Sequence, residues 1–380
     1  MGSGKTAARV GHLCRATATL LIATWMCWAT AEPATAQSHP SWDELAAAAR
    51  QEGKIVVIGP AHQEVRRVLP ETFKKRFGVD IEYLGGSAGA VASRLRSERT
   101  AGLYTADVAL AAIQTLANVF YQEKMLDPIK PLLVMPEVVD GSNWKKGEPW
   151  FPDPEQRYVL RLFSYLGEMF TINTDYVKPE DLKTARDLLL NPKWKGKIVT
   201  HDPRLSGTGS NIAAQLYAQL GGEQFLKQFY VDQKAVISAD ERQITDWVLR
   251  GTYPIAVGGD YGEVERMRAE GLPVMSVFDL PDVKAAITGG NGTLAVFNKA
   301  PHPNAAKLFV NWLASKEGLE IYARASTRAT TRNDIDEASF LPEATIPRPG
   351  VEYFDSYDWK FSVETKAEVR RLMEKLLATR

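Results

Sequence analysis

Patterns typical of buried strands and amphipathic helices alternate along most of the chain. Lys54–Gly59 is a continuous apolar, β-branched run, which is typical of a strand buried on both faces. Residues 64–77 carry apolar side chains at helical spacing and end at Gly78, a typical helix C-cap. The order then repeats with a strand at 79–84, a helix at 87–98, a strand at 106–110 and a helix at 113–124. This order predicts a parallel sheet with right-handed crossovers.

Residues 127–158 interrupt the alternation. They contain six prolines and two tryptophans, so we expect a long surface excursion without regular structure, with a packed loop as the alternative. Residues 158–173 are strand-like and are expected to cross into a second α/β unit. The elements expected in that unit are a strand at 197–200, helices at 210–220 and 223–229, a strand at 235–238, a helix at 241–250 and a strand at 255–259.

After Leu272, a strand at 274–278 is expected to return the chain to the first unit. A strand at 291–297 and helices at 303–314, 317–325 and 363–377 follow. The fold class is therefore α/β, with two lobes, two parallel or mixed sheets and a hinged cleft at the carboxyl ends of the strands. We expect the first lobe to comprise residues 37–165 and 273–345, and the second lobe residues 166–272 and 346–380.

The first 36 residues have the pattern of a secretory signal peptide. Lys5, Arg9 and Arg15 precede an apolar run at 16–31, and the Ala-Thr-Ala sequence at 34–36 is a typical cleavage motif. The run is shorter than the roughly 20 residues of a membrane-spanning helix. We therefore expect a periplasmic mature chain that is not inserted in the membrane. Both cysteines lie in the removed segment, so the mature chain would form no disulfide.

Charge and motif content narrow the function classes. The 46 basic and 46 acidic residues give a net charge of zero, without the basic excess of nucleic-acid-binding proteins. Zinc-ligand spacings and the dinucleotide-binding fingerprint are absent from the sequence. We expect a monomer that binds a small molecule, without a cofactor, a bound metal or nucleic acid.

The sequence LSGTGS at 205–210 is the strongest candidate binding site, because it follows a strand and opens a helix. Glycines allow a ligand to approach the backbone, hydroxyl groups add donors, and a helix N-terminus favours an anion. An ordinary helix cap gives the same pattern, and both roles are compatible. The candidate ligand-binding residues here are Ser206, Gly207, Thr208 and Gly209.

Arg242 lies at a strand-to-helix turn that is expected to face the same cleft. A guanidinium group suits a carboxylate or a phosphate. A solvated arginine that pairs with Glu241 or Asp240 explains the position equally well.

The sequence at 85–89 matches the G-x-S-x-G motif of serine hydrolases, with Ser87 as the nucleophile and His302 as a late histidine. That motif normally follows several strands, whereas here it follows the second strand of the mature chain. We predict that the protein is not an enzyme, and keep a secreted serine hydrolase as an alternative.

The segment 171–211 contains NTD, KPEDL, NPKWKGKI and SGTGSN. It resembles the second lobe of bacterial extracellular solute-binding proteins of the ferric-ion and small-anion type, which have the type II periplasmic binding protein fold. The resemblance implies a protein that closes on a ligand and delivers it to the permease of an ABC importer. It also implies that the loop at 205–210 binds a phosphate or carboxylate group, and that Ser87 and Ala88 contact the ligand through their backbone N–H groups. A sensory role remains open.

Ferric-ion binders of this type often place a histidine after the first strand, a carboxylate after the third and two adjacent tyrosines after a later strand. His62 matches the first position, but no carboxylate ends the third strand, and the pair is reduced to Asp260 and Tyr261. The resemblance therefore favours a small anionic organic or phosphorylated ligand, with His62, Asp260 and Tyr261 contacting the rest of it. Iron binding through His62 and Tyr261 remains the alternative.

Overall fold

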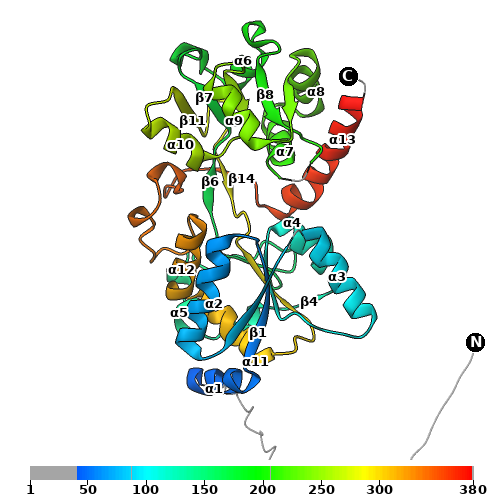
Figure 1. Ribbon diagram of the computed structural model, residues 1–380, viewed down its shortest axis with the longest axis vertical. Helices are drawn as coiled ribbons and strands as arrows, with labels where there is room; N and C mark the ends of the chain where they lie inside the picture. Colours follow the sequence, from blue (N-terminus) through cyan, green and yellow to red (C-terminus); the bar gives the residue numbers. More distant parts are fainter. Residues whose placement is uncertain (1–40, 87, 206, 379–380) are drawn as a thin grey trace, which may run out of the picture. The chain divides into compact units, whose positions relative to one another are not determined.

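The computed structural model of the protein describes residues 41–86, 88–205 and 207–378. The predicted signal peptide lies outside these residues. Two large sheets, each with helices packed on it, and one small sheet between them make up the described fold (Figure 1). The α/β fold class predicted from the alternating pattern is confirmed.

The first sheet contains six strands, mostly from the first half of the described chain. They are β1 (Lys54–Gly59), β2 (Asp80–Gly85), β3 (Val108–Ala111), β4 (Leu126–Asp127), β5 (Leu160–Arg161) and β13 (Thr293–Phe297). The order is β2-β1-β3-β13-β4, and β5 also pairs with β13. β1 is parallel to β2 and β3, whereas β13 is antiparallel to β3. The predicted parallel pairing therefore holds for the first three strands.

The continuous apolar run of β1 reflects burial on both faces of this sheet. Ile55 and Val57 belong to one hydrophobic cluster, and Val56 and Ile58 belong to another. Successive side chains of a strand point to opposite faces, so neither face can be polar here. Helices α2 (Gln63–Phe77) and α11 (Pro303–Ala314) contribute to the first cluster.

The second sheet has five strands. They are β7 (Phe170–Asn173), β8 (Ile198–His201), β9 (Val236–Ser238), β10 (Ile255–Val257) and β11 (Val274–Val277), in the order β11-β7-β10-β8-β9. β8 is parallel to both β9 and β10, whereas β7 is antiparallel to β10 and β11. Ile255 and Ala256 belong to clusters on opposite faces, so this sheet is also buried on both sides.

A three-stranded linking sheet joins the two units. It contains β6 (Tyr165–Gly167), β12 (Ala286–Thr288) and β14 (Phe354–Asp355), in the order β14-β12-β6. The segment predicted as one strand at 158–173 is thus divided among three sheets, as β5, β6 and β7. It passes from the first sheet to the second, as expected. The lobe boundaries themselves remain predictions.

Two sequence-based expectations are wrong. The strand at 274–278 was expected to return to the first unit, but β11 pairs with β7 in the second sheet. Its apolar residues fit either core, and only long-range pairing selects the partner. Residues 127–158 have only short elements, as predicted, yet they are not a surface excursion, because Val138, Trp144 and Phe151 belong to the first core.

Helices cover the sheets. The α-helices are α1 (Trp42–Glu52), α2, α3 (Ala88–Thr100), α4 (Ile113–Thr115), α5 (Pro136–Val139), α6 (Ala185–Leu190), α7 (Thr208–Leu220), α8 (Gly222–Lys227), α9 (Glu241–Leu249), α10 (Tyr261–Ala269), α11, α12 (Lys316–Ser326) and α13 (Lys366–Ala378). Three π-helices, η1 (Leu116–Tyr121), η6 (Gln228–Asp232) and η9 (Lys360–Thr365), adjoin α4, α8 and α13. Six 3₁₀ turns complete the described elements: η2 (Lys130–Leu132), η3 (Gly141–Asn143), η4 (Pro179–Asp181), η5 (Pro192–Trp194), η7 (Glu337–Ser339) and η8 (Glu343–Thr345). None of the helices within residues 41–86, 88–205 and 207–378 is both long enough and apolar enough to cross a membrane.

Candidate functional site

Three helices begin at the same edge of the second sheet. α7, α9 and α10 follow β8, β9 and β10, respectively. Because these three strands are parallel to one another, their carboxyl ends meet at one edge, and so do the N-termini of the helices that follow them. The N-terminus of an α-helix carries unpaired N–H groups and a partial positive charge. This edge is therefore suited to bind anionic groups.

Two of these three helix ends are closed by the chain itself. Asp240 caps α9 by accepting a hydrogen bond from the Gln243 backbone nitrogen at 3.1 Å. Asp260 caps α10 by accepting bonds from the backbone nitrogens of Gly262 and Glu263 at 3.0 and 3.3 Å. The cap residue of α7 is Gly207, which has no side chain to accept such bonds. α7 therefore differs from its two neighbours.

The turn into α7 requires glycine at two positions. Gly207 has φ 122° and ψ −143°, a conformation that L-residues with a side chain rarely adopt. At Gly209, an added Cβ would lie 2.2 Å from the Asp202 carbonyl oxygen. A side chain at either position would thus displace the backbone that opens the helix.

An open groove of about 590 Å³ lies over this turn. Gly207, Thr208, Gly209 and Arg242 all line it, so the structure brings together four residues that the sequence singled out. Arg242 is exposed on α9. The groove thus combines the uncapped start of a helix with a guanidinium group.

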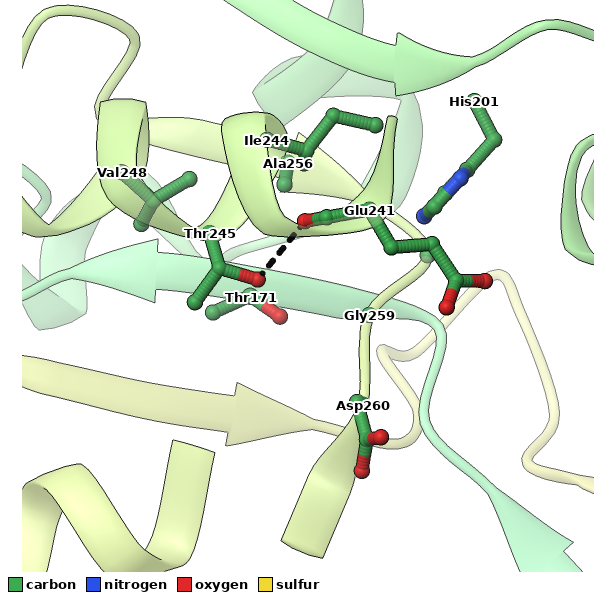
Figure 2. Close-up of a pocket in the computed structure, with 10 residues that line it drawn as sticks. Thr171, His201, Glu241, Ile244, Thr245, Val248, Ala256, Gly259 and Asp260 are labelled. Carbon is green, nitrogen blue, oxygen red and sulfur yellow. Dashed lines mark hydrogen bonds between the residues drawn. The ribbon is translucent and has the colours of Figure 1, made fainter. Parts of the chain in front are cut away.

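A small cavity of about 20 Å³ adjoins the groove, since His201 and Glu241 line both spaces. Asp260, Thr171 and Gly259 also line the cavity (Figure 2). Sequence reasoning identified Asp260 but missed His201 and Glu241 as site residues. Their positions in the sequence could have identified them. His201 ends β8, shortly before the loop at 205–210, and Glu241 opens α9, next to Arg242.

His201 and Glu241 differ in their surroundings. His201 is 7% exposed, and burial lowers the pKa of its imidazole, an effect that the neighbouring Glu241 carboxylate partly opposes. Glu241 is exposed and accepts a long hydrogen bond of 3.4 Å from the Thr208 hydroxyl. A neutral imidazole and a carboxylate therefore stand beside the opening of α7.

Glu168 is a buried carboxyl at the same end of the sheet. It accepts hydrogen bonds from the hydroxyl groups of Thr171, at 3.0 Å, and Ser276. Burial raises the pKa of Glu168 to about 7, against the effect of the two hydroxyl groups. A Cβ added at Gly259 would lie 1.8 Å from a carboxyl oxygen of Glu168, so this glycine makes room for the carboxyl group.

Two further predicted residues, His62 and Tyr261, do not line the groove or the small cavity. His62 is exposed at the cap position of α2 and makes no side-chain bond to that helix. Tyr261 opens α10, half-buried, with its ring 5.3 Å from that of Phe278, and burial raises the pKa of its hydroxyl. Ala88 is the first residue of α3. Ser87 and Ser206 lie outside the described residues.

The histidine considered for a hydrolase lies at the wrong end of the first sheet. The Nδ1 atom of His302 lies 2.8 Å from a carboxyl oxygen of Asp107, which directly precedes β3. Gly86 and Ala88 instead follow the carboxyl end of β2. Since β2 and β3 are both parallel to β1, these positions are at opposite edges. His302 is therefore not placed to activate a nucleophile at position 87.

Within residues 41–86, 88–205 and 207–378, no three His, Cys, Asp or Glu side chains gather closely enough to form a metal site. Tyr261, the ligand on which the ferric-ion alternative depends, is not among these residue types.

The chain is similar in sequence to one protein family and in fold to several solved structures. Residues 59–320 match the family described as bacterial extracellular solute-binding protein. Similar solved structures include the Trichodesmium protein IdiA (FutA) with iron and citrate, with 19% identity, a TM-score of 0.67 and coverage of 85% of this chain and 99% of that one. The Campylobacter jejuni ferric binding protein has 16% identity and a TM-score of 0.64, with 85% and 99% covered.

The periplasmic binding protein AfuA from Actinobacillus pleuropneumoniae, with bound fructose-6-phosphate, has 18% identity and a TM-score of 0.59, with 86% and 98% covered. At these identities the likeness establishes the fold, which is the two-lobe type II fold of periplasmic binding proteins. The family match covers more than half of the chain. The chain belongs to the bacterial extracellular solute-binding proteins, the ligand-binding components of ABC importers.

Proposed function

We propose that this protein binds a small anionic organic or phosphorylated ligand between its two lobes, in the periplasm, and presents it to an ABC permease. The observation that carries the proposal is the start of α7. It is the one helix of the three at this edge whose cap residue offers no carboxylate, and Arg242 lines the same groove. A ligand carboxylate or phosphate would take the place that Asp240 and Asp260 fill at α9 and α10.

The energetics favour an anion at this position. A negative charge at a helix N-terminus is stabilised by about 0.3–2 kcal/mol, depending on burial. Hydrogen bonds that involve a charged group contribute about 1.5–3 kcal/mol each. Backbone N–H groups together with the Arg242 guanidinium therefore favour an anionic group over a neutral one at this position.

Ligands of this kind are bound in two related structures. Citrate is bound with iron in the Trichodesmium protein, and fructose-6-phosphate is bound in AfuA. Both carry carboxylate or phosphate groups. Their presence in this fold supports an anionic ligand for the present chain.

A thermal-shift screen followed by calorimetry tests the proposal. The chain from Gln37 onward is exposed to inorganic phosphate, citrate, fructose 6-phosphate and Fe³⁺, and a binder raises the melting temperature. Thr208→Trp fills the groove and Arg242→Glu reverses its positive charge. Each is expected to weaken binding of the anion at least about tenfold, the equivalent of one charged hydrogen bond.

Arg250→Glu is the matched control. Arg250 follows α9 at its other end, exposed and paired with Asp246 at 2.8 Å, and it does not line the groove. Anion affinity that is unchanged in both groove variants would refute the proposed site. A visible charge-transfer band on adding Fe³⁺, lost in Tyr261→Phe, would instead establish ferric-ion binding. Covalent labelling of Ser87 by a fluorophosphonate probe would establish the hydrolase.

A further inference from the structure

The side chain of His201 is a polar group that the proposed anion site leaves unexplained. It is 7% exposed, and the described residues provide no hydrogen-bond partner for its ring nitrogens. Its ring nitrogens are not among the described buried atoms that lack a partner, so they reach the open space of the groove and the cavity. The imidazole lines both the groove and the small cavity. Its missing partner is therefore expected to enter from the groove.

Glu241 provides a second acceptor at the same place. Its carboxylate lines both spaces, and among residues 41–86, 88–205 and 207–378 it receives one long hydrogen bond of 3.4 Å, from the Thr208 hydroxyl. A carboxylate has about four lone-pair positions and no donor, so most of its capacity remains unused. In Figure 2 the imidazole of His201 points toward the side of the pocket where the Glu241 carboxylate lies.

The protonation state of His201 determines what the pair can recognise. Burial lowers the pKa of the imidazole, which favours the neutral form with one nitrogen free to accept. A neutral imidazole beside a carboxylate presents two acceptors. A second anionic group would be repelled there, whereas a hydroxyl or an ammonium group would satisfy both residues.

We infer that His201 and Glu241 form a donor subsite, which receives a hydroxyl or ammonium group of the same ligand whose anionic group lies at the start of α7. This inference rests on the proposed function and specifies the ligand class. The ligand is an anion that bears a hydrogen-bond donor a few bonds away, and not a bare anion. Thr208 connects the two subsites, since it is the first residue of α7 and its hydroxyl donates to the Glu241 carboxylate.

Matched probes test the donor subsite by calorimetry. Propyl phosphate has no donor on its carbon chain, glycerol 3-phosphate has two hydroxyl groups, and phosphoethanolamine has an ammonium group. Tricarballylate and citrate differ by one hydroxyl group. We expect wild-type protein to prefer the donor-bearing member of at least one series about tenfold or more, because a site with unpaired acceptors rejects an analogue that lacks the donor.

Two variants weaken the acceptors. His201→Phe removes one acceptor and keeps a ring of similar size. Glu241→Gln removes the charge and replaces one carboxylate oxygen by a donor while it keeps the shape of an exposed side chain, so it guards against misfolding of the first variant. Both are expected to reduce the preference to less than about threefold. Propyl phosphate and tricarballylate should bind Glu241→Gln at least as tightly as wild-type protein, because a like charge beside the anion is removed. Arg250→Gln is the control, because Arg250 lines neither the groove nor the cavity and pairs with Asp246 at 2.8 Å at the far end of α9.

The outcomes separate the two proposals. If the donor-free anions bind and wild-type protein shows no preference, or if the preference survives in both variants, the donor subsite is refuted and the anion site stands. If none of the anions binds, the proposed function is refuted, and the donor subsite with it. A preference for phosphoethanolamine alone identifies an ammonium ligand, and one for glycerol 3-phosphate or citrate identifies a hydroxyl ligand.

Discussion

Glu168 connects the small linking sheet to the edge of the second sheet at which α7, α9 and α10 begin. It directly follows β6 and precedes β7, and it is 8% exposed. Its hydroxyl partners, Thr171 and Ser276, belong to the neighbouring strands β7 and β11. Burial of a carboxyl group favours its protonated form, which explains the raised pKa.

This residue predicts a pH dependence of stability. The pKa of Glu168 is raised from 4.5 to about 7 in the folded protein, so its stabilising contribution is complete below pH 4.5 and is lost as the pH rises through 7. Between pH 5 and 8, the free energy of unfolding of wild-type protein should fall by about 1–3 kcal/mol relative to Glu168→Gln. Urea unfolding at both pH values measures this difference. Glu180→Gln, at an exposed glutamate, is the control and should follow wild-type protein; equal slopes in all three proteins would disprove the prediction.

Gly209 predicts a second effect at the scale of one residue. Gly209→Ala places a methyl group against the Asp202 carbonyl, so we expect a loss of more than about 2 kcal/mol in unfolding free energy and weaker anion binding. Gly271→Ala is the control, since Gly271 has φ 86° and open space around its Cβ position. It should cost only about 1–2 kcal/mol, for the left-handed backbone. Urea denaturation compares them, and equal losses would show that the contact at Gly209 is unimportant.

At the scale of elements, the C-terminal segment connects both large sheets. β14 pairs with β12 in the linking sheet, and Asp355 on β14 lies 3.0 Å from the buried Arg161 of β5. The Tyr357 hydroxyl accepts from the Ile113 backbone nitrogen at 2.9 Å and donates to the Gly290 carbonyl at 2.5 Å. α13 packs on α7, the helix whose N-terminus lines the groove.

Tyr357→Phe tests this connection. It leaves the Ile113 N–H group and the Gly290 carbonyl without their partner in a buried place, which should cost about 1–3 kcal/mol in unfolding free energy. Tyr353→Phe is a matched control, because the Tyr353 hydroxyl also accepts from a backbone nitrogen, that of Arg348, at an exposed site. A change of less than about 0.5 kcal/mol is expected there. Chemical denaturation distinguishes the two, and a neutral Tyr357→Phe would show that water replaces the hydroxyl.

The elements also show what a sequence can and cannot predict. The strand Lys54–Gly59 and the turn at 207–209 were predictable, because apolar runs and glycine-rich helix starts are local signals. β11 was expected in the wrong sheet because its partner strand lies far away in the sequence: Ser276 is opposite Thr171, about 105 residues earlier in the chain. His201 was missed because it ends an apolar strand and has no motif of its own, so only the three-dimensional neighbourhood shows it facing a groove.

At the scale of the whole molecule, the family assignment makes export the first requirement for function. The Ala-Thr-Ala sequence before Gln37 predicts that the periplasmic form begins at Gln37. Mass spectrometry of the periplasmic fraction of an expressing bacterium checks this directly. Ala36→Tyr places a large side chain at the cleavage position and should leave the uncleaved precursor with the membranes. Recovery of a periplasmic chain that begins at Met1 would contradict the prediction.

The three helix ends at the edge of the second sheet carry one more consequence. The carboxylates of Asp240 and Asp260 already accept the backbone hydrogen bonds at two of the three helix N-termini. Of these three helix starts, only that of α7 is then available to a ligand, so this edge is expected to hold one anionic group of the ligand. A relative or an engineered variant with glycine in place of Asp260 would offer a second helix start to a second anionic group. In this fold, the helix caps around the groove thus help to set how many anionic groups a ligand presents to this lobe.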